Sequence, residues 1–192
     1  MKKHETDAIL RRLDAGKEAV ASRRSVRRAE WLSPISWQGR RIVFEGRVAL
    51  VTGGTRGIGA AITQCLVESG ASVAAGYSRG KENAQKFVDQ LGGEGSRVSI
   101  HQGRVDDAAD CNRVVKEVMD RFGRVDYLVN NAGITVDKTV RKMTVDDWRQ
   151  VLDVNLSCAF QMTKAVLEHM IERGNGRIVN ISSVIGETGN VG

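Results

Sequence analysis

The sequence predicts an α/β protein whose core is a doubly wound parallel sheet, and three observations carry this prediction. From Gly46 onward, short apolar runs alternate with longer, amphipathic, helix-compatible stretches, which is the pattern of βαβ units. The first apolar run leads directly into a glycine-rich turn and then into a helix-compatible stretch. Polar or glycine-rich clusters follow the apolar runs, where the carboxyl ends of parallel strands would meet. We expect one domain over residues 46–192, with strand order 3-2-1-4-5.

The apolar runs are short enough to be strands of such a sheet. The predicted strands are Val48–Val51, Ser72–Gly76, Arg97–His101, Tyr127–Asn130 and Arg177–Ile181. The predicted helices are Ile58–Ser69, Lys81–Leu91, Ala108–Phe122 and Val145–Glu172. Thr144 is expected to cap the last helix together with Asp147, and Asp106 is expected to cap the helix before it.

The first 45 residues differ in character from the rest of the chain. Residues 1–41 carry 11 Lys and Arg against 5 Asp and Glu, so the net charge of +6 falls in this segment. Ala8–Ala29 is helix-compatible, and Ser33-Pro34 is typical of a linker. We interpret residues 1–45 as a mobile, basic, partly helical extension. The alternative is a contact with nucleic acid or an anionic membrane, for which the segment has no base-reading motif.

The cysteines and histidines do not have the spacing of a metal site. Cys65, Cys111 and Cys158 are far apart and each falls in a predicted helix, which is typical of reduced core cysteines. His101 closes an apolar alternation and is interpreted as structural. The sequence has no apolar run of roughly 18 residues and no secretory signal. We expect a cytoplasmic protein with no metal, no membrane contact and no nucleic-acid partner.

The turn after the first predicted strand, Thr52-Gly53-Gly54-Thr55-Arg56-Gly57-Ile58-Gly59, indicates a Rossmann-like dinucleotide-binding site. Gly53 can take a positive φ, Gly57 lets the backbone approach a pyrophosphate, and Gly59 lets the helix pack closely on the strand. The start of the following helix offers unpaired N–H groups and a positive dipole to phosphate groups.

The charge that follows the second predicted strand indicates which dinucleotide is bound. Proteins that bind NAD usually place a carboxylate here, where it holds the 2′-hydroxyl of the adenosine ribose. This chain has Tyr77-Ser78-Arg79-Gly80-Lys81 instead, with two cations and no carboxylate, and Arg56 adds a further cation. Cationic side chains suit a 2′-phosphate. We therefore predict NADP(H) in preference to NAD.

Four motifs in this order resemble the short-chain dehydrogenase/reductase family. They are the glycine turn at 52–59, Asn130-Asn131-Ala132-Gly133, Asn155 in Val154-Asn155-Leu156, and Ser183 in Asn180-Ile181-Ser182-Ser183. The resemblance runs from about Arg47 to Gly192. Within the family, the chain is similar to reductases of 3-oxoacyl thioesters, both the acetoacetyl-CoA reductases and the 3-oxoacyl carrier-protein reductases.

The resemblance implies NADPH-dependent reduction of a 3-oxoacyl-CoA or 3-oxoacyl carrier protein to the 3-hydroxyacyl form, by a homo-oligomer. Ser183 would hydrogen-bond the substrate carbonyl oxygen, and Asn155 would fix a water that relays protons. A tyrosine would deliver the proton, and a lysine four residues later would lower the pKa of that tyrosine.

The family places this tyrosine thirteen positions after the serine, whereas this sequence has only Tyr77 and Tyr127 and ends at Gly192. We therefore expect a C-terminally truncated member that binds nucleotide weakly and turns over little or nothing. The alternative is a catalytically inactive nucleotide-binding or assembly fragment.

The motifs and the resemblance together give the candidate site residues. The cofactor-binding candidates are Gly53, Thr55, Arg56, Gly57, Ile58, Gly59, Tyr77, Ser78, Arg79, Arg104, Val105, Asn131, Ala132 and Gly133. The substrate candidates are Asp137, Val184 and Asn190. Arg104 stands where the family commonly has Asp or Asn, and it could stack on the adenine, clash with it or face solvent. Lys138, Arg141 and Lys142 could meet the phosphates of a carrier arm or form a solvated face.

Overall fold

A computed structural model describes residues 36–37, 40–41, 43–93 and 97–189. The chain divides into two units, Met1–Ile42 and Val43–Gly192. In the first unit, β1 (Ser36–Trp37) pairs antiparallel with β2 (Arg40–Arg41). The predicted helix and linker of the basic extension lie outside the described residues. All elements that follow belong to the second unit.

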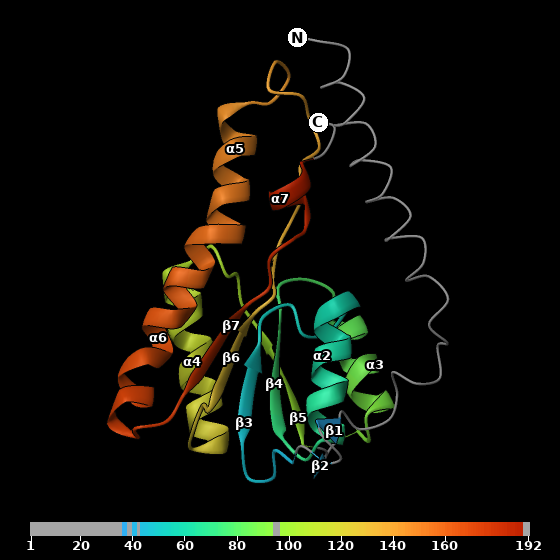
Figure 1. Cartoon of the computed structure of the whole chain (residues 1–192), viewed down its shortest axis with the longest axis vertical. Helices are drawn as coiled ribbons and strands as arrows, with labels where there is room; N and C mark the ends of the chain where they lie inside the picture. Colours follow the sequence, from blue (N-terminus) through green and yellow to red (C-terminus); the bar gives the residue numbers. More distant parts are fainter. Residues whose placement is uncertain (1–35, 38–39, 42, 94–96, 190–192) are drawn as a thin grey trace, which may run out of the picture. The chain divides into compact units, whose positions relative to one another are not determined.

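The second unit is built on a five-stranded sheet in which all neighbouring strands are parallel. In spatial order the strands are β5 (Val98–Gln102), β4 (Ser72–Tyr77), β3 (Val48–Val51), β6 (Tyr127–Asn130) and β7 (Arg177–Asn180). This confirms the predicted order 3-2-1-4-5 and the doubly wound fold (Figure 1). Each strand lies within one residue of its predicted bounds.

Helices cover both faces of the sheet (Figure 1). They are α2 (Gly57–Glu68) and α3 (Lys81–Gln90) on one face, and α4 (Ala108–Phe122) and α6 (Cys158–Glu172) on the other. The central strand β3 is buried on both sides: Leu50 packs in the cluster with α4 and α6, and Val51 packs in the cluster with α2. This double burial explains why β3 is a continuous apolar run rather than an alternating one.

The stretch predicted as one helix from Val145 to Glu172 is helical throughout but not uniform. It consists of α5 (Val145–Leu152), the π-helix η3 (Asp153–Ser157) and α6. The predicted cap at its start is confirmed, because Thr144 Oγ1 accepts from Asp147 N at 3.1 Å and Asp147 Oδ2 accepts from Thr144 N at 2.9 Å. A short helix, α7 (Ile185–Thr188), follows β7.

The helix α4 is capped by a different residue from the one predicted. The carboxylate of Asp107 accepts hydrogen bonds from the N–H groups of Ala109 and Asp110. Asp106 is instead bonded to the guanidinium of Arg104. The prediction that Asp106 caps α4 was therefore wrong, because two adjacent aspartates are equally good caps in sequence terms.

The three cysteines are free, and they lie on α2, α4 and α6. Burial is the main reason that the pKa of Cys111 and that of Cys158 are each raised to about 11. Both thiols are therefore protonated at neutral pH and are poor nucleophiles. Among the described residues, no helix combines the length and the apolar character that crossing a bilayer requires.

Candidate dinucleotide-binding and active site

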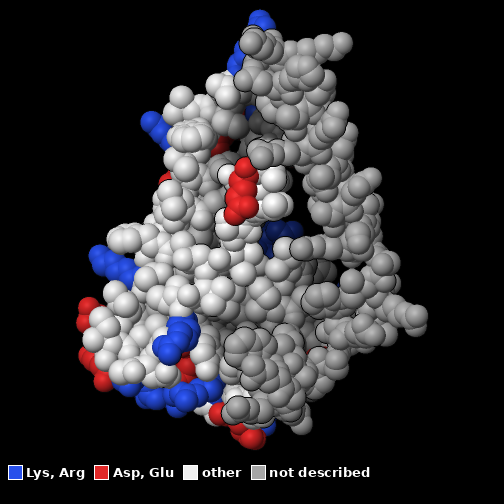
Figure 2. Space-filling view, in the orientation of Figure 1, with Lys and Arg blue, Asp and Glu red and all other residues white. Residues whose placement is uncertain are grey.

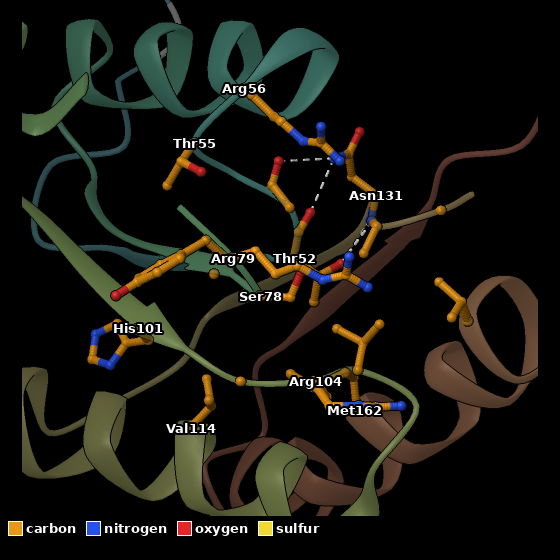
Figure 3. Close-up of a pocket in the computed structure, with 18 of the residues that line it drawn as sticks. Thr52, Thr55, Arg56, Ser78, Arg79, His101, Arg104, Val114, Asn131 and Met162 are labelled. Carbon is orange, nitrogen blue, oxygen red and sulfur yellow. Dashed lines mark hydrogen bonds between the residues drawn. The ribbon is translucent and has the colours of Figure 1, made fainter. Parts of the chain in front are cut away.

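A pocket of about 740 Å³ lies at the carboxyl ends of the central strands, where the fold predicts a ligand. Its walls come from the loops that follow β3, β4, β5 and β6. Figure 3 shows Arg56, Arg79 and Arg104 reaching it from three different loops. The predicted cofactor residues that line it are Gly53, Thr55, Arg56, Gly57, Ile58, Tyr77, Ser78, Arg79, Arg104, Val105, Asn131, Ala132 and Gly133.

The glycines of the turn after β3 allow a backbone path that side chains would block. Gly53 and Gly57 have φ values of 63° and 54°, in the left-handed region that favours glycine. A Cβ on Gly59 would lie 2.1 Å from the carbonyl oxygen of Gly53. Gly59 therefore packs against the turn and does not line the pocket, unlike the other predicted cofactor residues. Arg56 is the N-cap residue of α2, and its side chain makes no hydrogen bond to the first N–H groups of the helix. These N–H groups therefore remain available to an anion.

Thr52 and Asn131 join this turn to the loop after β6. Thr52 is buried, and its Oγ1 accepts from the N–H groups of Asn131 and Ala132, each at 3.0 Å. In the other direction, Asn131 Nδ2 donates to the carbonyl oxygen of Thr52 at 3.0 Å (Figure 3). A second buried threonine, Thr63 of α2, donates to the carbonyl oxygen of Gly54 at 2.9 Å. The pocket wall is therefore fixed before any ligand binds.

The arginines at the pocket differ in whether they are already paired. Within the described part of the chain, Arg56 and Arg79 have no hydrogen bond or ion pair. Arg104, in contrast, is held by Asp106 through Nε and Nη2, at 3.2 and 2.5 Å. The hydrogen bond between them raises the pKa of Arg104 and lowers that of Asp106. Two cations at the pocket are thus free to meet an anionic ligand, and one is neutralised.

The negative charge of the carboxylate at the pocket is offset by hydrogen bonds from a guanidinium and a backbone N–H, so it opposes an anionic ligand only weakly. Asp110 is the one carboxylate among the described lining residues. It accepts from Arg104 N at 2.8 Å and from Arg113 Nη2 at 2.6 Å, and these bonds lower its pKa. The segment after β4 contains no carboxylate, as its sequence indicated.

Asn155 lies on the π-helix η3 and clamps the loop after β6. Its Oδ1 accepts from Ile134 N at 2.9 Å, and its Nδ2 donates to Ile134 O at 2.9 Å. A π-helix changes the register of the backbone hydrogen bonds and often marks a functional site. Gly133, next to this clamp, would bring a Cβ to 3.5 Å from Asn155 Oδ1. The predicted Asn155 therefore ties the loop after β6 to the π-helix η3.

The remaining predicted residues are not brought into the pocket wall. Ser183 is exposed, and its Oγ accepts from Ile185 N at 3.3 Å at the start of α7. Asp137 and Val184 are exposed and do not line the pocket, and Asn190 lies outside the described residues. Among the residues with described placement, no group of His, Cys, Asp and Glu could hold a metal.

Sequence reasoning missed the residues that form the floor of the pocket. Thr52 also lines the pocket and could have been found, because it is the first residue of the glycine turn. The floor residues come instead from buried strand and helix positions that look like ordinary core in the sequence. They include Leu50, His101, Cys111, Val114 and Met162.

Comparison with known proteins adds to this geometry. A family model for short chain dehydrogenases matches residues 47–192. The chain is 43% identical over 149 residues to the 3-oxoacyl-[acyl-carrier-protein] reductase FabG of Vibrio cholerae, and 42% identical over 149 residues to that of Escherichia coli. It is 40% identical over 146 residues to the 3-oxoacyl-[acyl-carrier-protein] reductase of Synechocystis.

These alignments cover 78%, 78% and 76% of this chain, and 59% of each relative. The chain therefore spans about three fifths of the length of these curated relatives. The family model covers every strand of the parallel sheet and every loop that lines the pocket. On this match, the chain belongs to the short-chain dehydrogenase/reductase family.

Proposed function

We propose that the pocket binds NADP(H) and that the chain carries the cofactor-binding part of a reductase of 3-oxoacyl thioesters. The observation that carries the proposal is the pair of unpaired guanidinium groups, Arg56 and Arg79, at a pocket whose glycine turn suits a pyrophosphate. The carboxylate that would hold the 2′-hydroxyl of NAD does not follow β4. The names of the relatives, which are 3-oxoacyl carrier-protein reductases, support the substrate class.

In this reaction the ketone gains a hydride at carbon and a proton at oxygen, and the bound cofactor supplies the hydride. The N–H groups at the start of α2 would hold the pyrophosphate. Arg79 would pair with the 2′-phosphate, and Ser183 would donate a hydrogen bond to the substrate oxygen as charge develops there. Asn155 would hold the loop after β6 in place and fix a water for proton transfer.

The basic side chains before α5 have different roles in this proposal. Lys138 donates to Asp147 at 2.7 Å, so it is already committed to the capping box of α5. Arg141 and Lys142 are exposed in the turn before that helix. They are the candidates that remain for contact with the phosphates of CoA or of a carrier-protein arm.

A second candidate function is nucleotide binding without turnover. It is favoured by the positions of the two tyrosines in this sequence. Tyr77 is buried on β4 at the pocket, and Tyr127 packs edge-on against Phe44, with ring centroids 5.4 Å apart. Tyr77 and Lys81 have the spacing of a Tyr-x-x-x-Lys segment, but they precede Ser183 in the sequence instead of following it, and Tyr127 is followed four positions on by Asn131. Neither tyrosine therefore stands where the family places its proton donor.

The test combines NADPH titration with NADPH oxidation in the presence of acetoacetyl-CoA or a 3-oxoacyl carrier protein. Thioester-dependent oxidation that falls in Ser183→Ala but not in the neighbouring Ser182→Ala supports the reductase. Saturable NADPH binding without oxidation supports the second candidate. If no saturable binding is observed in folded protein, both are contradicted.

We also infer that the chain associates with copies of itself. Phe160, Ile171 and Val179 expose 67%, 62% and 49% of their surface, and Figure 2 shows a broad area without charged side chains over β7. Apolar surface of this kind favours association. Sedimentation velocity should give oligomers that Phe160→Lys shifts toward monomer, whereas Glu168→Gln on the same helix does not. A monomeric wild type at tens of micromolar would contradict this inference.

A further inference from the structure

Three side chains of α4 form a ladder against the carboxyl end of β5. Asp110, Arg113 and Glu117 are spaced by three and four residues, which places them on one face of the helix. Each contacts a different position of the strand or of the loop that follows it. We call these three residues the α4 ladder.

The deepest contact of the α4 ladder is the one made by Glu117. Its Oε2 lies 2.9 Å from Nδ1 of His101, and Nε2 of His101 lies 2.8 Å from Oγ of Ser99. His101 and Ser99 are 6% and 7% exposed. Because His101 also lines the pocket while Glu117 does not, this contact joins α4 to the floor of the pocket.

Arg113 and Asp110 extend the α4 ladder from Glu117 to the rim of the pocket. Arg113 donates to Glu117 Oε1 at 2.6 Å, to the carbonyl oxygen of Gln102 at 2.9 Å, and to Asp110 Oδ1 at 2.6 Å. Asp110 Oδ2 then accepts from the backbone N–H of Arg104 at 2.8 Å. The contacts therefore run without a break from His101 to Arg104, alongside one wall of the pocket.

That wall, residues 103–105, has little freedom to move. The N–H of Gly103 donates to the carbonyl oxygen of Tyr77 at 2.9 Å. A Cβ on Gly103 would lie 2.7 Å from a methyl group of Val114. Residues 103–105 therefore pack directly against α4, and the α4 ladder fixes their position along the helix axis.

The charge state of the ladder supports this role. Burial favours the neutral form of Glu117, but hydrogen bonds from His101 and Arg113 outweigh it and lower the pKa of the carboxyl group. Glu117 is therefore charged at neutral pH and makes charge-assisted bonds, which are the stronger kind.

We propose that Glu117 is a positioning residue that raises affinity for the adenosine half of the dinucleotide by fixing residues 103–105 through His101 and Arg113. The proposal rests on the function proposed above. In a doubly wound sheet the end of the second strand meets the adenosine ribose; here that end carries Arg79. The next loop outward in the sheet, after β5, therefore faces the base.

The experiment compares three ligands, chosen because they report on different halves of the pocket. NADPH reports on the whole site, adenosine 2′,5′-bisphosphate on the adenosine half, and reduced nicotinamide mononucleotide on the other half. In Glu117→Ala we expect the Kd of the first two to rise by about fivefold or more, since the variant removes charge-assisted bonds. The Kd of the mononucleotide should not change.

Two further variants act as control and as second test. Asp120→Ala removes the Lys116–Asp120 ion pair, one turn along the same helix and exposed, and should leave all three Kd values unchanged. Arg113→Lys keeps the charge but cannot reach Gln102, Asp110 and Glu117 together, so it should reproduce the selective loss if Glu117→Ala does not fold.

The results that would overturn the proposal are distinct from those that test the function. Wild-type affinities in Glu117→Ala or Arg113→Lys, or an equal loss for all three ligands, would contradict the positioning role alone. If wild-type protein gave no saturable binding of NADPH, both the proposed function and this inference would fail.

Discussion

Asp126 lies directly before β6 and is the most enclosed carboxylate among the described residues, with 0% of its surface exposed. It accepts from Val48 N at 2.9 Å, from Arg47 Nη1 at 3.2 Å and from Asn175 Nδ2 at 3.1 Å, and it also pairs with Arg124. Burial alone would raise the pKa of Asp126, but the bonds from Arg124, Val48 and Arg47 outweigh it and lower the pKa. One side chain thereby joins the starts of β3, β6 and β7.

Replacing this carboxylate should be costly. We predict that Asp126→Asn lowers the free energy of unfolding by about 3 kcal/mol, because it replaces a fully buried carboxylate, which accepts from Arg47, Arg124 and Val48 N, by an amide that has only one acceptor atom. Urea denaturation measures the loss. Asp120→Asn, which breaks an exposed ion pair, should cost no more than about 0.5 kcal/mol. Equal losses in the two variants would contradict the role given to Asp126.

Asp147 makes part of the stability depend on pH. The hydrogen bond from Lys138, followed by those from Thr144, lowers its pKa from 3.8 to about 2. A carboxyl group whose pKa is lower in the folded state stabilises the fold above its unfolded pKa, and this stability is lost as the pH falls through the folded pKa. We predict that wild type is more stable than Asp147→Asn at pH 6 and that the two converge near pH 2. Denaturation midpoints between these pH values test this, and a constant difference would contradict it.

At the scale of elements, the sequence predicted the strands and helices well because the apolar runs of a parallel sheet are unambiguous. Several local features escaped it, among them the short helix α7, the cap of α4 and the π-helix η3. The choice between Asp106 and Asp107 as the cap of α4 depends on backbone geometry, and Arg104 decides it by binding Asp106. The apolar pattern does not predict the π-helix η3, because the hydrogen bonds between Asn155 and Ile134 form only in the folded chain.

The turn between β3 and α2 is the element with the least tolerance for a side chain. We predict that Gly59→Ala weakens NADPH binding at least tenfold and destabilises the fold by about 1–3 kcal/mol, since its Cβ would overlap the backbone of Gly53. Gly186→Ala is the matched control, because a Cβ there meets nothing within 4 Å. Isothermal titration and thermal unfolding provide the two readouts. Wild-type binding by Gly59→Ala would contradict the packing described for the turn.

At the scale of the whole molecule, the pocket joins segments that lie far apart in the sequence. Its rim was predicted from motifs, because the carboxyl ends of parallel strands share one edge of the sheet. Its floor was not, because Leu50, His101 and Met162 are core positions that become pocket residues only through the placement of α4 and α6. Ser183 was identified from the family resemblance and not from geometry, and its exposed position leaves its role to be tested.

The central claim is that unpaired cations at this pocket select a dinucleotide with a 2′-phosphate. The most direct measurement is the Kd of NADPH and of NADH for wild type, Arg79→Ala and, as control, Lys86→Ala, an exposed residue of α3 that does not line the pocket. We predict that wild type and Lys86→Ala bind NADPH about tenfold more tightly than NADH, and that Arg79→Ala loses most of this preference. Tighter binding of NADH by the wild type, or no saturable binding of NADPH, would contradict the account.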